Sequence, residues 1–400
     1  MLSLMTLDLE LNMYHAAALG AALFYLGTEV VKHVPFFQTC DTLVSLLGGL
    51  LFAFLNTVLY ACGLPYFTFD TTLQTVFMNL FFASIGFSFS LPSLLCGGRA
   101  AAAYLLLGAA LTVAQTLLGA GVMLGLGQDP RLGLALGSIS LISGPGIAAA
   151  LGPALETAGC AGGSAAGLSA AALGLVAGSI LSGSAADQQI SKCKVLGRRS
   201  FENSSETAFL RSCPKRYVIA FMLVLFSAGF GDWASATVQT ITGIPLPSYI
   251  GGMLVAMTLR NMMDAFGIHS PSEAMDSLGY MTLSIFLAMA MMTSKLWELA
   301  DLAFPIIAAL TVQLIFLIVF FCVPVFRVMG KGYGTAGTAG VTGLAAKAIG
   351  SAMGKVQTAA HQYGPSSTVS FPSFLPGRAY VDFVMILVTG LMIPMLGLLP

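Results

Sequence analysis

The sequence contains very little charge. Of its 400 residues only 8% are Asp, Glu, Lys or Arg, whereas 57% are hydrophobic, and the mean hydropathy is +0.88. Soluble globular domains carry about 25% charged residues, because a surface that faces water has to be solvated. A chain with so few charges cannot cover a soluble fold, so we expect its surroundings to be the lipid bilayer.

Several signals of other protein classes are also missing. The 17 basic and 17 acidic residues balance, which gives no electrostatic reason to expect nucleic acid as a partner. The seven cysteines show no CxxC or Cys/His spacing of a metal site, so we expect free thiols. The sequence has no Walker A, GxSxG or HExxH motif. We therefore expect neither an enzyme nor an ATP-driven pump, and no cofactor.

The apolar residues are gathered into about ten stretches of roughly 20 residues, the length that crosses a bilayer as a helix. The sequence predicts these spans near residues 13–31, 43–62, 72–95, 100–127, 161–183, 216–238, 244–263, 277–299, 302–326 and 379–399. Two further apolar segments, near 132–155 and 335–357, are rich in Gly, Ala, Ser and Thr. The fold class predicted is an all-α polytopic membrane protein.

One hydrophilic segment, residues 186–216, interrupts the apolar pattern at the middle of the chain and holds seven Lys and Arg residues. Cytoplasmic loops of membrane proteins concentrate Lys and Arg. We therefore interpret this segment as a cytoplasmic linker in an inner (plasma) membrane, in preference to a patch for nucleic acid or lipid headgroups. Counting five spans in each direction places both termini outside.

The two parts of the chain on either side of this linker, residues 1–185 and 217–400, resemble each other. Phe81-Phe82-Ala83 matches Phe286-Leu287-Ala288, and Ala110–Val113 matches Ala309–Val312. Each part has five predicted spans and one Gly-rich segment after the fourth span. Because five is odd, the second part must be inverted relative to the first, which is a common plan in secondary transporters.

The first Gly-rich segment contains Ser-Gly-Pro-Gly, which breaks a helix in the middle of an apolar run. Broken backbone at membrane depth is tolerated where it is buried in protein or lines an aqueous cavity. We favour a re-entrant hairpin over a straight helix that uses small residues for close packing. Its candidate binding residues for substrate or ion are Ser138, Ser140, Ser143, Gly144 and Gly146.

The second Gly-rich segment and the last span supply the other candidates. Thr342, Gly343 and Lys347 lie in the segment, and a lysine at membrane depth is costly unless it is functional or reaches the interface. Arg378 and Asp382 are four residues apart, on one helical face. They either form an ion pair that fixes the helix, or bind a carboxylate and a cation or proton respectively.

These stretches resemble the sodium/glutamate symporter family of bacteria over almost the whole chain. The likeness is carried by the runs FFASIG at 81–86, GSISL at 137–141 and LSIFLAMAMMTSKLWEL at 283–299, together with Met329-Gly330-Lys331, Tyr363–Ser366 and Asp382. It implies two inverted five-helix repeats with a re-entrant loop in each. It also implies sodium as coupling ion, glutamate as substrate, and a homodimer in which the transport parts move against a fixed scaffold.

The sequence departs from the family pattern in both Gly-rich segments. Ser143-Gly144-Pro145-Gly146 stands where the family typically has Gly-Gly-His-Gly, Lys347 replaces a glycine, and Arg378 replaces an alanine. We predict an ion-coupled symporter for a small anionic solute, with glutamate as first choice. The alternatives are a symporter for another amino or dicarboxylic acid with altered or absent sodium coupling, and a transport-impaired relative that acts as a membrane sensor or interaction protein.

Overall fold

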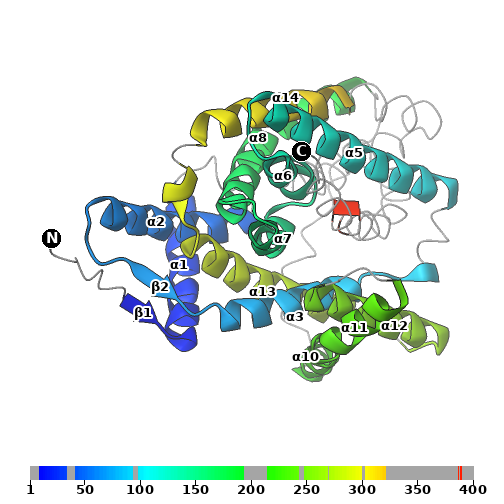
Figure 1. Cartoon of the computed structure of the whole chain (residues 1–400). Coiled ribbons are helices and arrows are strands. Elements are labelled where there is room, and N and C mark those ends of the chain that lie inside the picture. Colours follow the sequence, from blue (N-terminus) through cyan, green and yellow to red (C-terminus); the bar gives the residue numbers. More distant parts are fainter. Residues whose placement is uncertain are drawn as a thin grey trace.

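The computed structural model describes residues 9–33, 41–92, 98–192, 214–242, 247–268, 270–299 and 302–320, together with Ile386, Val388 and Thr389. This part of the chain is mostly helical, as the sequence predicts (Figure 1). The exceptions are two three-residue strands, β1 (Leu9–Leu11) and β2 (Phe67–Phe69), which pair in parallel beside the start of α1.

The helices follow the predicted spans closely. In chain order they are α1 (Met13–His33), α2 (Asp41–Ala61), α3 (Thr72–Gly86), α5 (Gly98–Gly125), α6 (Pro130–Leu134), the π-helix η2 (Ala135–Ile142), α7 (Pro145–Thr157), α8 (Gly163–Lys192), α10 (Pro214–Gly229), α11 (Gly231–Thr242), α12 (Ser248–Ala265), α13 (Ser272–Met292), the 3₁₀ helix η3 (Leu296–Leu299) and α14 (Ala303–Phe320). Each of the first nine predicted spans overlaps at least one of these helices. The tenth, 379–399, lies almost entirely outside the described residues.

Length and composition mark several of these helices as membrane spans. Within the described residues, α2, α5 and α13 each contain a segment long and apolar enough to cross a bilayer. Helices α10 and α11 add a fourth if the pair, bent by 41° at Phe230, is counted as one span. The remaining apolar helices, such as α3 and α14, are shorter, so the predicted count of ten spans stays a prediction.

The helices form two groups that pack against each other (Figure 1). The first helix group consists of α1, α2, α3 and α10 to α13, and the second consists of α5, α6, η2, α7, α8 and α14. Helix α13 packs against α1, α2 and α3 and also contacts α7, so it joins the two groups. One buried apolar cluster crosses this boundary and includes Phe286 of α13 and Leu151 of α7.

Glycines allow the helices of the first group to approach closely at two crossings. Between α1 and α2, a Cβ added to Gly27 would overlap the carbonyl group of Val44. Between α11 and α12, a Cβ added to Gly251 would overlap the carbonyl oxygen of Gly231. Small residues at helix crossings are typical of membrane proteins, where close backbone packing helps to hold helices together.

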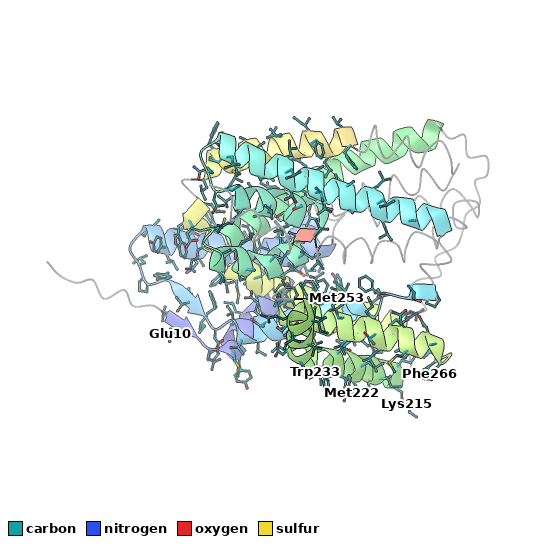
Figure 2. All side chains as sticks on the ribbon, turned by 45° about the vertical axis from the view of Figure 1, so that its right-hand side comes forward. Glu10, Lys215, Met222, Trp233, Met253 and Phe266 are labelled. Atoms are coloured by element: carbon teal, nitrogen blue, oxygen red, sulfur yellow. The ribbon has the colours of Figure 1, made fainter. Side chains whose placement is uncertain are left out.

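Large apolar side chains cover the outside of the first group. Figure 2 shows Met222, Trp233 and Phe266 projecting from α10, α11 and the end of α12, and their exposed fractions are 57%, 69% and 74%. Such a dense apolar surface would be unfavourable in water and is expected where helices face lipid. The helical composition and this surface are those of a membrane protein.

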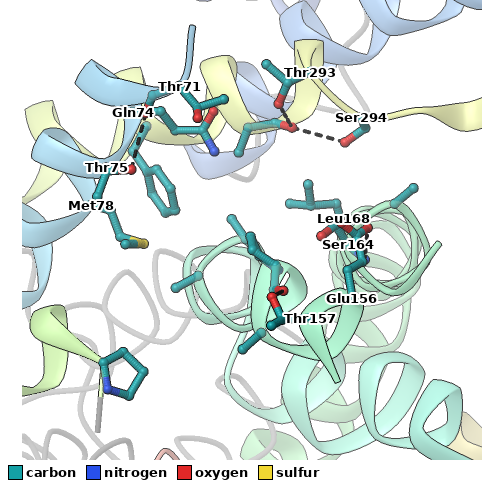
Figure 3. Close-up of a pocket in the computed structure, with 18 of the residues that line it drawn as sticks. Thr71, Gln74, Thr75, Met78, Glu156, Thr157, Ser164, Leu168, Thr293 and Ser294 are labelled. Atoms are coloured by element: carbon teal, nitrogen blue, oxygen red, sulfur yellow. Dashed lines mark hydrogen bonds between the residues drawn. The ribbon is translucent and has the colours of Figure 1, made fainter. Parts of the chain in front are cut away.

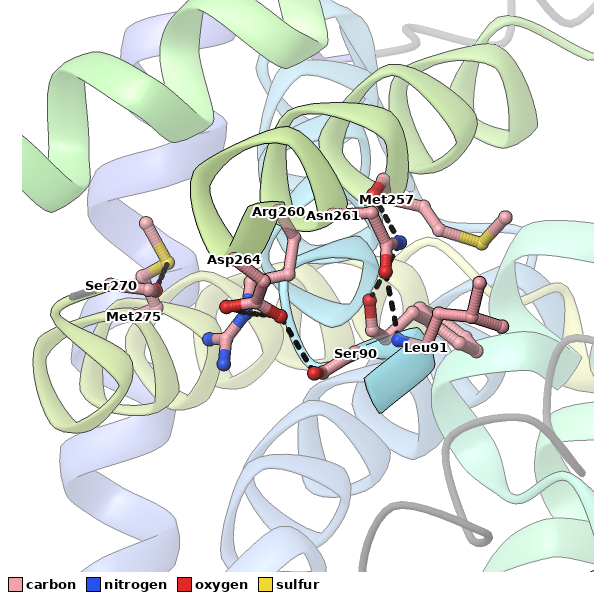
Figure 4. A network of polar contacts seen from close by, with 9 residues as sticks. Ser90, Leu91, Met257, Arg260, Asn261, Asp264, Ser270 and Met275 are labelled. Carbon is pink, nitrogen blue, oxygen red and sulfur yellow. Dashed lines mark hydrogen bonds and ion pairs between the residues drawn. The ribbon is translucent and has the colours of Figure 1, made fainter. Parts of the chain in front are cut away.

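A polar network fastens α12 to the segment that follows α3, and so joins the two sequence halves (Figure 4). The side chain of Asn261 accepts a hydrogen bond from the backbone N–H of Leu91 at 2.8 Å and donates one to the carbonyl oxygen of Phe89 at 3.1 Å. Beside it, Ser90 donates to Asp264 at 2.7 Å, and Arg260 pairs with the same carboxylate at 3.1 Å. These bonds satisfy backbone groups where regular helix ends.

Candidate functional site

The first Gly-rich segment is broken in the structure where the sequence predicts a break. We call residues 130–157 the first broken segment. It begins with α6, which Asp129 caps through a 2.8 Å bond from the backbone N–H of Arg131, and continues as η2. Regular structure stops at Ser143 and Gly144, and Gly144 has a φ of 89°, a conformation that favours glycine. Helix α7 then starts at Pro145, a residue favoured at the first helical position.

The two ends of the first broken segment meet. The guanidinium Nη1 of Arg131, at its start, donates a hydrogen bond to the carbonyl oxygen of Ala158, directly after its end. Pro130–Ile142 and Pro145–Thr157 have 13 residues each. A 13-residue helix is about 20 Å long, whereas the apolar core of a bilayer is about 30 Å thick. Neither arm is therefore long enough to cross the membrane alone.

The predicted binding residues of this segment fall into two sets. The hydroxyls of Ser138 and Ser140 are buried inside the second group, where Ser138 accepts from Thr116 at 2.9 Å and Ser140 donates to the carbonyl oxygen of Gly167 at 2.7 Å. By contrast, Ser143, Gly144 and Gly146 form the tip between η2 and α7. A Cβ on Gly146 would lie 3.0 Å from Phe81 of α3 and from Leu283 of α13. The tip therefore reaches the boundary between the two helix groups.

A cavity of about 580 Å³ lies along the same boundary (Figure 3). One wall is formed by α3, the start of α12 and the end of α13, and the other wall by α7 and the start of α8. Its size is typical of a site for a small solute. The lining includes Ala149, which is four residues, or roughly one helical turn, after the first residue of α7 at Pro145. The cavity thus approaches the tip of the first broken segment.

The cavity wall carries polar groups that the sequence alone does not single out. Tyr249 is only 4% exposed, and its hydroxyl has no hydrogen-bond partner among the described residues. The side-chain oxygen of Gln74 is also buried without such a partner, and Figure 3 shows this side chain on the wall opposite Ser164 and Glu156. The charged residues of the described lining are Glu156, Lys295 and Glu298.

Comparison with known proteins decides the family. The family profile described as "Sodium/glutamate symporter" matches residues 9–365. The chain belongs to the sodium/glutamate symporter family. It is 31% identical to the sodium/glutamate symporter of Escherichia coli (strain K12) over 374 residues, covering 92% of this chain and 93% of that protein. It is 28% identical to the sodium/glutamate symporter of Haemophilus influenzae over 383 residues, 93% of this chain and 94% of the relative.

Membership of the sodium/glutamate symporter family confirms the resemblance predicted from the sequence and makes this chain a member of a transporter family. Several predicted site residues of this family member lie outside the described part of the chain. They are the whole segment 335–357 and Thr342, Gly343, Lys347, Arg378 and Asp382. Their roles stay predictions.

Proposed function

We propose that this protein is a secondary transporter that couples sodium to the uptake of glutamate, or of a closely related anionic amino acid, across the inner membrane. The observation that carries the proposal is the cavity between the two helix groups, which leads to the broken segment of a chain in the sodium/glutamate symporter family. A transporter needs such a passage, because its substrate must reach a site near the middle of the membrane.

The start of α7 is the group best suited to hold a carboxylate. The first backbone N–H groups of a helix have no partner within the helix, and the helix dipole makes this end positive. Anions bind readily at such ends, and broken helices in transporters use them for substrate carboxylates. Tyr249 and Gln74 belong to the lining of the approach to the tip, and side-chain rotation would let their buried oxygens bond to an amino acid on its way there.

The repeated arrangement of helices supports two related halves. The α1–α2 crossing uses Gly27 and Gly48, and the α11–α12 crossing uses Gly231 and Gly251. The spacing between matching glycines is close to that between Phe81-Phe82-Ala83 and Phe286-Leu287-Ala288. By this matching α2 corresponds to α12 and α3 to α13. Their contacts correspond as well, since α3 packs against α12 and α13 packs against α2. The proposal places five spans and one hairpin in each half, with opposite orientation.

The contact between Arg131 and Ala158 supports a re-entrant hairpin for the first broken segment. A segment whose two ends meet enters and leaves the membrane on one side. The cavity opens on the same side, since Glu156 and the start of α8 belong to its lining. Helix α8 runs from there to Lys192 at the basic central linker. With the linker in the cytoplasm, as its charge predicts, the cavity faces outward and both termini are outside.

The test is binding by the purified, detergent-solubilised protein. Glutamate, aspartate, glutamine and dicarboxylic acids are compared for their effect on the midpoint of thermal unfolding, in sodium chloride and in choline chloride. We expect glutamate to raise the midpoint most, and more strongly with sodium. Stabilisation by a dicarboxylic acid only, or equal stabilisation in both salts, would favour the altered symporter instead. A relative without transport activity would bind glutamate but not transport it, and uptake into liposomes distinguishes this case from a working symporter. Dimerisation, implied by the resemblance, is read from the mass of the same preparation.

A further inference from the structure

Four polar side chains are completely buried inside the second helix group, where three helices meet. They are Gln115 and Thr116 of α5, Ser138 of η2 and Gln313 of α14, and each is 0% exposed. Gln313 belongs to the second sequence half, whereas the other three belong to the first. The cluster is separate from the cavity, because none of the four residues lines it.

Only part of the hydrogen-bonding capacity of this cluster is used. The hydroxyl of Thr116 donates to the hydroxyl oxygen of Ser138 at 2.9 Å, and the amide nitrogen of Gln313 donates to the carbonyl oxygen of Gly133 at 3.1 Å. The side-chain oxygen of Gln313, and both the oxygen and the nitrogen of Gln115, are buried and have no partner among the described residues. Buried polar atoms are rarely left unpaired, and such a group calls for a bound ion or water as its explanation.

The unpaired amides belong to helices that approach each other closely. Gln115 and Gly119 are four residues apart and so lie on one face of α5. A Cβ on Gly119 would lie 2.6 Å from the amide nitrogen of Gln313, and a Cβ on Gly137 would overlap the side-chain amide of the same residue. The absence of side chains at these two glycines lets α5 and η2 approach α14. Gln313 of the second sequence half thus reaches the two helices of the first half that carry Gln115, Thr116 and Ser138.

The chemistry of the cluster fits a small monovalent cation. Its unpaired groups are the amide oxygens of Gln115 and Gln313 and the amide nitrogen of Gln115. With the two hydroxyls the cluster offers four neutral oxygens, and no Asp or Glu belongs to it. Hard cations prefer oxygen ligands, and divalent ions are usually held by carboxylates. Neutral oxygens at broken or irregular helices are the usual ligands of monovalent cations in transporters. Irregular π-helical backbone, as in η2, is frequent at functional sites.

We propose that this cluster is a binding site for the coupling sodium ion, formed by one side-chain oxygen from each of its members: Gln115, Thr116, Ser138 and Gln313. This inference rests on the proposed sodium-coupled function and specifies where one sodium ion binds. Because ligands come from α5, η2 and α14, an ion at this site would hold the first broken segment against helices of both halves. Sodium binding would thereby set the position of the tip at which the substrate arrives.

The test measures the sodium concentration that gives half-maximal thermal stabilisation of the purified protein, without substrate and with choline as the balancing cation. Removing one ligand oxygen in Thr116→Val or Ser138→Ala should raise this concentration by about tenfold or more. The matched control is Thr112→Val, one turn earlier on α5, whose equally buried hydroxyl is already bonded to the carbonyl oxygen of Gly108 at 2.9 Å. It should leave the sodium concentration within about twofold of the wild-type value.

A second variant should acquire a new pH dependence of sodium binding, which a misfolded protein would not show. Gln115→Glu keeps the shape of the side chain but replaces the amide with a carboxyl, which holds a proton when no cation is near. Sodium must then displace that proton, so its affinity should increase by about tenfold for each unit of rising pH below the carboxyl pKa. The wild type has no such group at this position and should show a much weaker dependence.

The outcomes separate this inference from the proposed function. If sodium does not stabilise the wild type at all, both the sodium coupling and this site are wrong. If sodium stabilises the wild type, and Thr116→Val, Ser138→Ala and Gln115→Glu all respond to sodium and pH as the wild type does, sodium binds elsewhere. The site is then overturned while the proposed function stands.

Discussion

The side chain of Arg131 donates a hydrogen bond to the carbonyl oxygen of Ala158, so the start of α6 and the end of α7 lie together. The chain between them therefore leaves this place and returns to it. Such a contact is expected of the proposed hairpin and not of a segment that crosses the membrane once, because the two ends of a crossing segment would be separated by the bilayer.

Cross-linking tests this geometry directly. Cysteines at positions 131 and 158, in a background without native cysteines, should be joined efficiently by a short bifunctional maleimide in intact membranes. The paired positions would be about 30 Å apart if the segment crossed the bilayer, beyond the reach of such a reagent. Failure to cross-link, with both cysteines individually reactive, would contradict the hairpin.

The glycine crossings give a second prediction, on stability. Gly231→Ala should lower the midpoint of thermal unfolding, because the added Cβ would meet the carbonyl oxygen of Ser248 at 2.6 Å. Overpacking of this kind costs about 1–3 kcal/mol. Gly229→Ala, two residues away, is the control, since an added Cβ there meets nothing within 4 Å. Gly27→Ala should resemble Gly231→Ala if the two crossings are equivalent. Equal tolerance of all three substitutions would refute the close crossings.

Orientation in the membrane is tested at the central linker. A cysteine at Ser204, in a background without the native cysteines, should resist a membrane-impermeant thiol reagent in intact cells and react after lysis, because the basic linker is predicted to be cytoplasmic. Of the native cysteines in the described part of the chain, Cys62 is exposed and must be replaced. Burial raises the pKa of the Cys160 thiol to about 12, which keeps it protonated and slow to react. Rapid labelling of position 204 from outside would show that the orientation is the opposite of the predicted one.

Lys347 carries a prediction about ion coupling that comes from the sequence. We predict that its ammonium partly replaces a bound cation, because the family has a glycine there. Two such charges within about 4 Å repel by about 4 kcal/mol at an effective dielectric constant of 20, roughly a thousandfold in affinity. Lys347→Gly should therefore increase the stimulation of substrate binding by sodium, while Lys347→Arg should preserve the native response. Steep sodium dependence in the wild type that Lys347→Gly leaves unchanged would show that the lysine is a surface residue.

The sequence predicted most of the helices because their cause is local. A run of about 20 apolar residues has to form a helix in lipid, where backbone groups have no water to bond. The break at Gly144 was equally predictable, since Gly-Pro-Gly cannot continue a helix. The sequence did not predict that α3 and α8 face each other across a cavity, because that depends on how helices distant in sequence pack.

The candidate site was predicted in part for the same reason. The local motif Ser-Gly-Pro-Gly predicts Ser143, Gly144 and Gly146, and the structure places them at the tip. Gln74 and Tyr249 carry no motif, and only the fold brings them to one cavity. Gln115 and Gln313 had a signal that was overlooked, because each closely follows the repeated run Ala-Leu-Thr-Val in an apolar span. A polar amide in such a span is costly unless it has a partner.

The central claim is that this protein carries glutamate with sodium, and uptake by the purified protein in liposomes tests it most directly. Radiolabelled glutamate is offered outside, with a sodium gradient directed inward and with an equal gradient of choline as the control. We predict accumulation above the equilibrium level with sodium, abolished when the gradient is collapsed, and no accumulation with choline. Glutamate that fails to accumulate under the sodium gradient, in liposomes whose protein is folded and binds glutamate, would contradict the account.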